Sequence, residues 1–317
     1  MPVETVAVVS TGSMGSALAR VWLDGGLRVV ATAQGRSART ERLAEQVGVE
    51  LLPTLAAAVA AADAVVSVVP PSEAAAVARE VEAASRTAGT TPLFADLNAI
   101  APRTVRDLPL TRLDLVDGSI SGPPPTRPGT TTVYLSGRRA RELADAPAPG
   151  LNVVVVGEEI GLASAVKMST ASVYKGTVAL LAHALLAARA NGVLEHVLDD
   201  LGPAYVDRIE SALARAGSKA PRYVGEMREI AATQAEAGLT PALFDAMAEV
   251  YAELARSPLA GRAPEELGAA DLETVLAALS EAGAARADSA GTRPGTSPDR
   301  DDARRPRARL FGRGRGG

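Results

Sequence analysis

The chain has 317 residues, a hydrophobic content of 47% and a formal net charge of −4, which is enough apolar material for one or two ordinary domain cores. It contains no cysteine and only two histidines, His183 and His196, so disulfide bonds and thiolate catalysis are excluded and no metal site is expected. The N-terminus lacks a basic leader, and the most apolar segments are short or carry Asp63, so we expect a cytoplasmic protein with no membrane partner.

Short β-branched runs alternate with alanine-rich helical stretches over the first half of the chain. The runs are VETVAVVS, LRVVAT, ADAVVSVV, PLFADLN, LDLVDGS, TTVYLSG and LNVVVV. Strands that alternate with helices indicate parallel βαβ units with right-handed crossovers and helices on both faces of one sheet. We therefore predict an α/β Rossmann domain over residues 1–158.

The pattern becomes helical after residue 158. We expect breaks between helices at 191–192, 202–203, 217–221, 238–241 and 257–258, where Gly, Asn or Pro interrupts the pattern. Residues 159–283 are predicted to form an all-α domain for substrate binding and dimerisation. Residues 284–317 are rich in Arg, Gly and Pro and nearly free of large apolar residues, which predicts a disordered, solvated tail. Because the rest of the chain is acidic, we do not expect nucleic acid as the main partner; the alternative is that the Arg/Gly-rich tail contacts nucleic acid.

The segment AVVSTGSMGSALA (residues 7–19) places two glycines between a strand and a helix start. In this context G-x-G-x-x-G binds a dinucleotide. Gly12 lets the backbone approach a pyrophosphate, Gly15 allows close helix–strand packing, and the first N–H groups of the helix attract phosphates. Ser10 replaces the first glycine, and we interpret it as a small residue that hydrogen-bonds its own turn. The predicted cofactor contacts are Ser10, Thr11, Gly12, Ser13, Met14 and Gly15.

The end of the second strand indicates which nicotinamide cofactor is used. NAD sites place an acidic residue there for the ribose hydroxyls, whereas this chain has ATAQGRSARTERL with no acid before Glu41. Arg36, Ser37 and Arg39 stand in that place, and a guanidinium group suits a 2′-phosphate. We therefore predict NADP(H), with Arg36, Ser37 and Arg39 as contacts. The alternative is that these are surface residues that open a helix.

Several further segments together resemble the β-hydroxyacid dehydrogenases and 6-phosphogluconate dehydrogenase. DAVVSVVPPSEA resembles that family's fourth strand and cofactor loop, ADLNAIAP its fifth strand, VDGSISGPPP its substrate segment, and GLASAVKMSTASVYKG its interdomain helix with the catalytic lysine. The most similar branch carries a phosphogluconate dehydrogenase C-terminal-like helical domain of unknown function. The resemblance covers the chain from Val3 to the middle of the helical domain, without the tail. It implies that Val69 and Pro70 contact the cofactor and that Lys167 is catalytic.

Lys167 also fits the chemistry of carbonyl reduction. The developing alkoxide needs a proton, and a lysine can donate it when burial lowers its pKa. Lys167 lies in an apolar, small-residue stretch, and Tyr174 and Lys175 follow two turns later on the same helix, so we assign all three as catalytic candidates. Where the family has a substrate-holding asparagine, this chain has Ala171 beside Thr170, which puts the usual substrate in doubt.

The remaining predicted contacts concern the substrate. Backbone N–H groups around Ser121 and Gly122 suit a carboxylate, and Ser119 and Thr170 are the nearby hydroxyls; the alternative is that residues 119–125 form only a rigid connector. Asn98, at the end of the fifth strand, either contacts nicotinamide or substrate or caps its own turn. His183 is expected in the core and His196 at the surface.

These observations predict an NADPH-dependent oxidoreductase that moves a hydride between nicotinamide and a carbonyl or hydroxyl carbon of a small carboxylate. We expect a homodimer formed through the helical domain. One alternative is imine reduction on the same scaffold. Another is a non-catalytic NADPH-binding sensor or scaffold, for which Lys167→Ala would leave function intact while deletion of residues 284–317 would abolish it.

Overall fold

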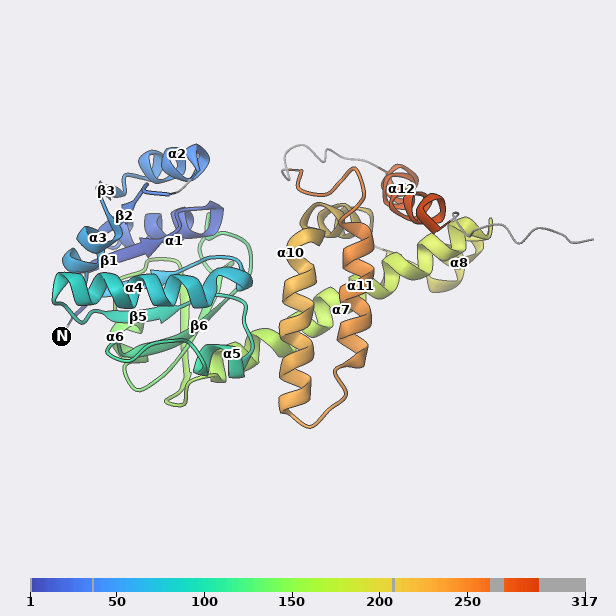
Figure 1. Cartoon of the computed structure of the whole chain (residues 1–317). Helices are drawn as coiled ribbons and strands as arrows, with labels where there is room; N and C mark the ends of the chain where they lie inside the picture. Colours follow the sequence, from blue (N-terminus) through green and yellow to red (C-terminus); the bar gives the residue numbers. More distant parts are fainter. Residues whose placement is uncertain (1, 36, 207–208, 263–270, 291–317) are drawn as a thin grey trace, which may run out of the picture.

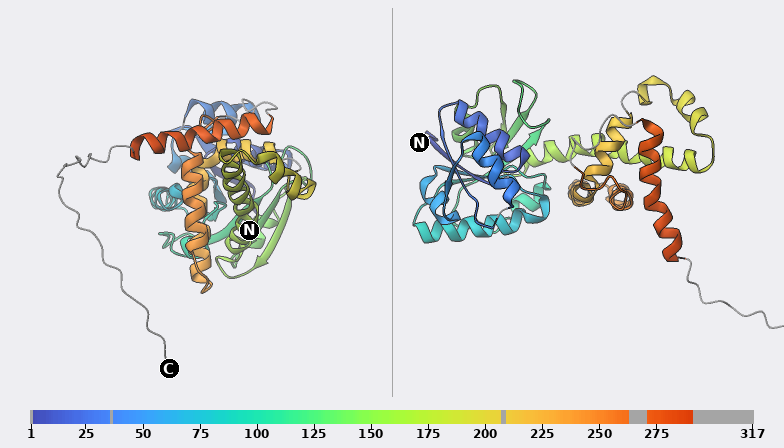
Figure 2. Two further views of the ribbon diagram at one scale, coloured as in Figure 1. Left: turned by 90° about the vertical axis from the view of Figure 1, so that its right-hand side faces the viewer. Right: turned by 90° about the horizontal axis from the view of Figure 1, so that it is seen from above.

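The computed structural model describes residues 2–35, 37–206, 209–262 and 271–290 of the chain. A sheet domain that contains the N-terminus lies at one end and a helical domain at the other, and helix α7 (Leu162–Ala190) runs from the first into the second (Figure 1). The two further views show the same division (Figure 2). The predicted contact of Arg36 and the tail beyond residue 290 lie outside the described residues.

Eight strands form one sheet in the order β3-β2-β1-β4-β5-β6-β7-β8. They are β1 (Thr5–Val9), β2 (Arg28–Thr32), β3 (Glu50–Leu52), β4 (Ala64–Ser67), β5 (Leu93–Asp96), β6 (Leu115–Ser121), β7 (Thr132–Ser136) and β8 (Asn152–Gly157). The predicted α/β Rossmann architecture is confirmed, although the pairing is not wholly parallel. Strands β6 and β7 are antiparallel because the described segment between them contains no crossover helix. The sequence analysis missed β3, whose three residues are too few for a recognisable alternation.

Helices cover both faces of the sheet. They are α1 (Ser13–Asp24), α2 (Ala38–Val47), α3 (Leu55–Ala61), the 3-10 helix η1 (Pro71–Glu73), α4 (Ala74–Ala88), α5 (Pro102–Arg106) and α6 (Ala140–Ala144). Successive strand residues point to opposite faces, so Val66 packs in one core with Trp22 of α1, whereas Val65 packs in the other with Val77 of α4. This double covering is what a mainly parallel sheet requires.

The second domain is helical, as predicted. It consists of most of α7 together with α8 (Leu194–Leu201), α9 (Pro203–Val206), α10 (Ile209–Glu236), α11 (Ala242–Leu254) and α12 (Leu272–Ala290). Its core joins Met168 and Leu185 of α7 with Leu213 and Ile230 of α10 and Tyr251 of α11. Helices α10 and α11 lie side by side in an antiparallel hairpin against α7 (Figure 1).

Four of the five expected helix breaks coincide with helix ends, but the break expected at residues 217–221 is wrong. Helix α10 continues through this segment. Gly217 serves close packing instead, since a Cβ there would lie 2.9 Å from Leu279 and 3.1 Å from Leu259. Pro221 is exposed, so its ring meets solvent, and the one backbone hydrogen bond that it lacks does not end the helix.

Helix α7 is longer than the apolar segment noted in the sequence. Among the described residues it is the one helix long and apolar enough to cross a membrane, and 33% of its most apolar 18-residue window is buried. The helix packs on β6, β7 and α5 as well as on α10 and α11, so it is a shared element of both domains. At the other end of the helical domain, α12 extends to Ala290, seven residues past the boundary that we predicted.

Candidate active site

The glycine turn has the geometry of an anion-binding helix start. Gly12 is the N-cap of α1 and no side chain caps the helix there, so the first N–H groups lack partners within the helix. A Cβ on Gly12 would meet no atom within 4 Å, whereas a Cβ on Gly15 would lie 2.1 Å from the carbonyl oxygen of Ser10. Gly12 therefore leaves the approach to the turn open, and Gly15 allows α1 to pack against β1.

Ser10 has a backbone conformation that explains why glycine is expected at this position. Its φ of +76° is the one positive value among the described non-glycine residues, and a Cβ makes this region costly. The Ser10 side chain makes no hydrogen bond with the described residues, so the self-bonded turn that we expected is not present. Ser10 thus adopts the glycine conformation without a compensating contact.

The start of α2 lies against the glycine turn. Nη2 of Arg39 donates a hydrogen bond to Oγ of Ser13 (3.1 Å), and Oγ1 of Thr11 donates to the carbonyl oxygen of Thr40 (3.1 Å). Ser37 is the N-cap of α2, where its Oγ accepts a hydrogen bond from the Thr40 N–H (3.3 Å). Arg39 therefore lies at the edge of the glycine turn.

Asn98 is buried and its side chain is fully engaged by the protein. Its Oδ1 accepts a hydrogen bond from the N–H of Val69 (2.6 Å), while its Nδ2 donates to Asp96 (2.7 Å) and to Ser67 (3.0 Å). These contacts hold the loop after β4, which carries the predicted contacts Val69 and Pro70, against the end of β5. Of the two roles considered for Asn98, this geometry supports the one that organises its own turn.

Asp96 is the acidic member of this group. Burial, together with the charge of Asp117 on the neighbouring strand, raises the pKa of Asp96 to about 7, although the N–H donors of Asn98 oppose the shift. The sequence analysis did not single out Asp96. Its place at the end of a buried strand, two residues before Asn98, is the signal that would have identified it.

The carboxylate of Asp117 joins β6 to the start of α7. Its Oδ2 accepts hydrogen bonds from the N–H groups of Gly161 and Ser164 (2.9 and 3.1 Å) and from Oγ of Ser136 (2.8 Å), and its Oδ1 accepts one from Oγ of Ser164 (2.6 Å). Unpaired N–H groups and the helix dipole favour a carboxylate at a helix start. The predicted substrate contact Ser119 belongs to the same joint, because its buried Oγ donates to the carbonyl oxygen of Ala163 (2.8 Å).

Lys167 lies in the second turn of α7, beside the end of β6. Its Nζ donates a hydrogen bond to the carbonyl oxygen of Ile120 (2.7 Å). Burial of the side chain, reinforced by the positive charge of Arg222, lowers the pKa of Lys167. An amine with a lowered pKa gives up its proton more readily than a solvated lysine does.

Two predicted substrate contacts follow Ile120 directly. Ser121 ends β6, and Gly122 has a φ of +111°, with a Cβ position only 2.3 Å from the carbonyl oxygen of Thr130. Glycine is therefore required there. Thr170 lies one turn beyond Lys167, and its hydroxyl is hydrogen-bonded to the carbonyl oxygens of Val166 and Lys167 (3.0 and 3.1 Å). The structure thus brings Lys167, Ser121 and Gly122 to one junction.

Lys175 points from α7 toward α10. Its Nζ forms an ion pair with the buried Glu226 and lies 4.8 Å from the centre of the Tyr223 ring. Burial and the positive charges of Lys167, Arg222 and Lys219 lower the pKa of Lys175. Our sequence analysis missed the α10 residues because it placed a helix break among them.

Tyr174, the third catalytic candidate, lies elsewhere on α7. Its side chain is 73% exposed and makes no hydrogen bond with the described residues, so within one chain it does not join Lys167 and Lys175. His183 is also exposed. Our expectation of a core histidine is therefore wrong, because position 183 falls on the outer face of α7. His196 is exposed, as expected.

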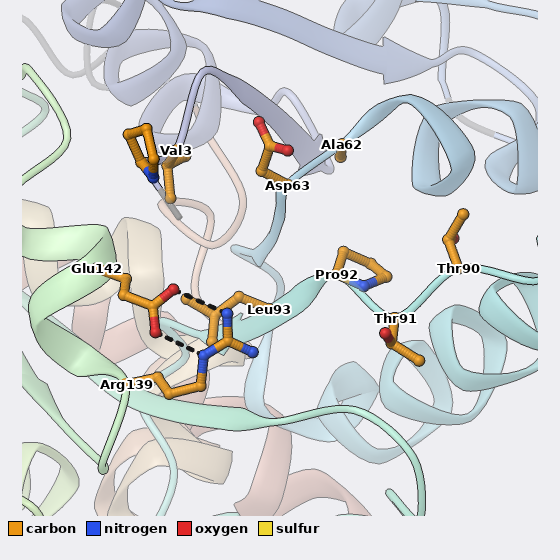
Figure 3. A pocket seen from close by; sticks show the side chains of 10 residues that line it. Val3, Ala62, Asp63, Thr90, Thr91, Pro92, Leu93, Arg139 and Glu142 are labelled. Carbon is orange, nitrogen blue, oxygen red and sulfur yellow. Dashed lines mark hydrogen bonds and ion pairs between the residues drawn. The ribbon is translucent and has the colours of Figure 1, made fainter.

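A small cavity of about 160 Å³ lies at the opposite edge of the sheet, before the starts of β1, β4 and β5 (Figure 3). Its charged side chains are engaged by the protein. Asp63 accepts hydrogen bonds from the N–H groups of Glu4 and Thr5, and Arg139 pairs with Glu142. Ligands of open α/β sheets bind at the carboxyl ends of the strands, so this cavity is not the counterpart of the glycine turn.

Two family models match the chain. Residues 5–89 match the family described as NADP oxidoreductase, coenzyme F420-dependent, and residues 188–254 match a domain of unknown function, DUF1932. A solved conserved protein of unknown function, described as structurally similar to 3-hydroxyacid dehydrogenases, is 29% identical. That likeness covers 84% of this chain and 100% of the other, with a TM-score of 0.61. The chain is therefore similar, over most of its length, to a protein whose fold resembles that of the 3-hydroxyacid dehydrogenases.

Two further similarities were found. An uncharacterized 28.5 kDa protein from Methanothermus fervidus is 25% identical over 232 residues, which span 71% of this chain and 88% of that protein. A structure of 3-hydroxyisobutyrate dehydrogenase with L-serine, from Mycobacterium tuberculosis, shares the fold at 20% identity. It covers 88% of this chain and 99% of the other, with a TM-score of 0.62. The second similarity shows the fold alone, whereas the family model over residues 5–89 and the 29% identical protein support an NAD(P)-dependent oxidoreductase.

Proposed function

We propose that this 3-hydroxyacid dehydrogenase-like protein is an NADPH-dependent reductase of small oxoacids, or the corresponding dehydrogenase, with Lys167 as its general acid or base. The observation that carries the proposal is the partly buried Lys167 amine, held 2.7 Å from the Ile120 carbonyl oxygen at the carboxyl end of β6. Substrates of open α/β sheets bind outside the carboxyl ends of the strands. The amine is therefore in the part of the fold where a reacting carbonyl would lie.

The residues around the glycine turn fit a dinucleotide. The open space over Gly12 suits a pyrophosphate, and Arg39 beside Ser13 suits a phosphate on the ribose. The described residues between the end of β2 and Arg39 include no acidic residue, which also favours NADPH over NADH. When bound, the cofactor supplies the hydride. Asn98 contributes by fixing the position of Val69 through its side-chain oxygen.

Lys167 supplies the proton in the direction of reduction. Its lowered pKa brings the amine closer to the range in which proton transfer is efficient at neutral pH. A hydrogen bond to the Ile120 carbonyl oxygen fixes Nζ while leaving its other hydrogens for the substrate oxygen. The backbone at Ser121 and Gly122, next along the chain, provides the expected place for the substrate carboxylate.

The proposal is tested by the rate of NADPH oxidation with panels of 2- and 3-oxoacids and cyclic imines, and of NADP reduction with hydroxyacids. We expect turnover of an oxoacid that falls about 10²- to 10⁴-fold in Lys167→Ala, while NADPH affinity, measured by fluorescence titration, is unchanged. Ser169→Ala, an exposed position on the same helix, is the matched control. Full turnover in Lys167→Ala, or turnover of imines alone, would contradict the proposal.

A homodimer formed through α7 is part of this proposal. The apolar side chains of Val173 and Leu180 on its outer face are 64% and 62% exposed, and Tyr174 lies beside them. Exposed apolar patches of this kind mark interaction surfaces, and a second copy supplies a complementary apolar helix. Leu180→Glu is expected to give a monomer in light scattering, whereas Ala246→Glu, on exposed α11 surface, should not. A monomeric wild-type chain would refute the dimer.

A further inference from the structure

The three lysines of the chain gather between two helices. Lys167 and Lys175 lie on α7, and Lys219 lies on α10. Arg222 is one turn beyond Lys219, on the same side of α10, because residues three apart are neighbours on a helix. The positive charge of Lys175 interacts with those of Lys167, Lys219 and Arg222, so the four cations share one region.

One carboxylate faces this group among the residues that the structure describes. Glu226 pairs with Lys175 and, at 2.8 Å, with Nε of Arg222. Lys167 and Lys219 form no ion pair with the described residues, and burial and neighbouring cations lower the pKa of each. Elsewhere in the protein, Arg139 shows the reverse ratio of charges, since its single guanidinium group pairs with two carboxylates, those of Glu142 and Asp114. The α7–α10 region therefore holds an excess of positive charge, which is costly unless an anion compensates it.

The excess charge is within reach of a ligand. The Arg222 side chain is 54% exposed, and Lys219 is partly exposed. Lys175, in contrast, is sheltered by Glu226 and the Tyr223 ring. An anion that enters between the helices would thus meet Arg222 and Lys219 first, while Glu226 and Lys175 support them from the protein side.

The cations lie at two places along α7, with Lys167 at the end of β6 and Lys175 beside α10. Lys167 is committed to the end of β6 through the Ile120 carbonyl oxygen, where the reacting carbon is placed. Lys175 lies eight residues further along α7, which is about 12 Å at 1.5 Å per residue. Arg222 is linked to Lys175 through Glu226, so an anionic group bound by Arg222 lies toward the Lys175 end of this region, away from the Ile120 carbonyl oxygen.

We propose that Arg222 and Lys219 bind a second anionic group, a carboxylate or a phosphate, at the end of the substrate remote from Lys167. This inference rests on the proposed oxoacid reductase activity and names its substrate class. The substrate is a dianionic oxoacid or hydroxyacid. Arg222 offers a planar pair of donors to either group, and Glu226 is a positioning residue that holds Arg222 in place.

The first experiment compares matched substrates of the full-length protein with NADPH. The carboxylate arm uses 2-oxopentanoate against 2-oxoglutarate, and the phosphate arm uses hydroxypyruvate against 3-phosphohydroxypyruvate. We expect kcat/KM to be higher for the dianionic member of one pair, and the arm that responds identifies the group. Equal or lower kcat/KM for the dianionic member of both pairs would overturn the inference, while turnover itself would leave the oxoacid reductase activity standing.

Variants of α10 then assign the preference to residues. Arg222→Gln and Lys219→Gln should each reduce the preference about 10- to 100-fold, mainly through KM, as loss of a charge-assisted hydrogen bond does. Arg222→Lys should restore part of it, and Arg228→Gln, an exposed α10 position, should leave it unchanged. Equal preferences in wild type and Arg222→Gln would show that the cations only hold α7 to α10. Thermal unfolding of each variant verifies that it is folded.

A binding measurement separates this inference from the proposed activity. Calorimetric titration of the full chain compares glutarate with pentanoate and glycerol 3-phosphate with glycerol, none of which is reducible by NADPH at a carbonyl. Tighter binding of one dianion or phosphate that is lost in Arg222→Gln supports the anion site even where no oxoacid is turned over. Turnover of oxoacids without any such binding overturns the anion site and leaves the activity in place.

Discussion

The glycine turn and the α7–α10 region differ in what creates the site. At the glycine turn, the backbone forms the site. Gly12 leaves open space, Gly15 allows close packing, and helix α1 presents its first N–H groups. Between α7 and α10, the site consists of long charged side chains from helices that are about 50 residues apart in sequence. A short local pattern can specify the first kind of site, whereas the second depends on how two helices pack.

The two regions also differ in charge compensation. Arg39, beside the glycine turn, makes a hydrogen bond to a neutral hydroxyl on the surface, where water screens its charge. Lys167, Lys175 and Lys219 are partly buried, and burial and neighbouring cations lower the pKa of each. Strong interaction between like charges is a property of functional sites more often than of structural ones. The following predictions use this contrast.

The largest effect is expected from substituting the two glycines of the turn. Gly15→Ala should lower the free energy of unfolding by about 1–3 kcal/mol, because its Cβ would press on the Ser10 carbonyl oxygen and α1 would have to move. Gly12→Ala is the matched control, since its Cβ meets no protein atom; it should lose less than about 1 kcal/mol of stability but bind NADPH more weakly. Urea unfolding and NADPH titration of both variants check this, and equal unfolding curves for the two would refute it.

The next prediction concerns the role of Arg39 in the choice between NADPH and NADH. Arg39→Ala should lower NADPH affinity about 10-fold relative to NADH affinity, because a charge-assisted contact to the 2′-phosphate is lost. Arg42→Ala, at an exposed position one turn further along α2, is the control. Equal losses of NADPH and NADH affinity in Arg39→Ala would show that Arg39 belongs to the surface alone, and the double variant with Arg36→Ala then tests the residue outside the described part.

The pH dependence of turnover tests the α7–α10 side. Reduction requires protonated Lys167, so its rate should fall as pH rises through the lowered pKa of Lys167. Oxidation, which needs the neutral amine, should rise over the same range. Arg222→Gln removes a nearby positive charge, which raises the pKa of Lys167 and should move both limbs to higher pH by about half a unit. If the pH profiles of wild type and variant coincide, the charge of Arg222 does not affect the pKa of Lys167, and the prediction is wrong.

Ser10 provides the smallest predicted effect. Ser10→Gly should raise the free energy of unfolding by about 0.5–1 kcal/mol, since glycine accepts a φ of +76° without the cost of a Cβ. Ser10→Ala keeps the Cβ and should match wild type, because the hydroxyl makes no hydrogen bond to lose. Thermal unfolding of the three proteins decides between strain and hydrogen bonding. A large loss of stability in Ser10→Ala would instead indicate that the Ser10 hydroxyl forms the hydrogen bond within its own turn that the sequence predicted.

Sequence patterns predicted the sheet domain well because its signals are local. Strand–turn–helix order around Gly12 and Gly15 fixes the place of the turn, and alternation of β-branched runs with helices fixes the fold class. The short β3 was not predicted, because three residues show no period. Strand β7 was predicted, but its antiparallel direction was not, because the direction of a strand is set by the connection before it. The left-handed conformation of Ser10 could not be predicted from a serine.

In the α7–α10 region, only the residues on α7 could be predicted from the sequence. Lys167 and Lys175 were found because lysines are rare here and both lie in an apolar stretch. Glu226, Arg222 and Tyr223 were missed because Gly217 and Pro221 resemble a helix break, whereas in the folded chain tertiary packing against Leu259 and Leu279 uses the glycine and keeps α10 continuous. The hydrogen bonds of Asn98 to Ser67 and Asp96 likewise depend on the ends of β4 and β5 meeting in space.

The joint at Asp117 has a mechanical consequence. One carboxylate on β6 holds the first turn of α7 through Gly161 and Ser164, and the 29 residues of α7 make a rod about 43 Å long. Pivoting of that rod by about 5° at Asp117 moves its far end by about 4 Å, by the same helix geometry. A rotation of α7 about Asp117 would therefore turn a displacement smaller than an ångström beside Lys167 into a movement of several ångströms at the far end of the helix.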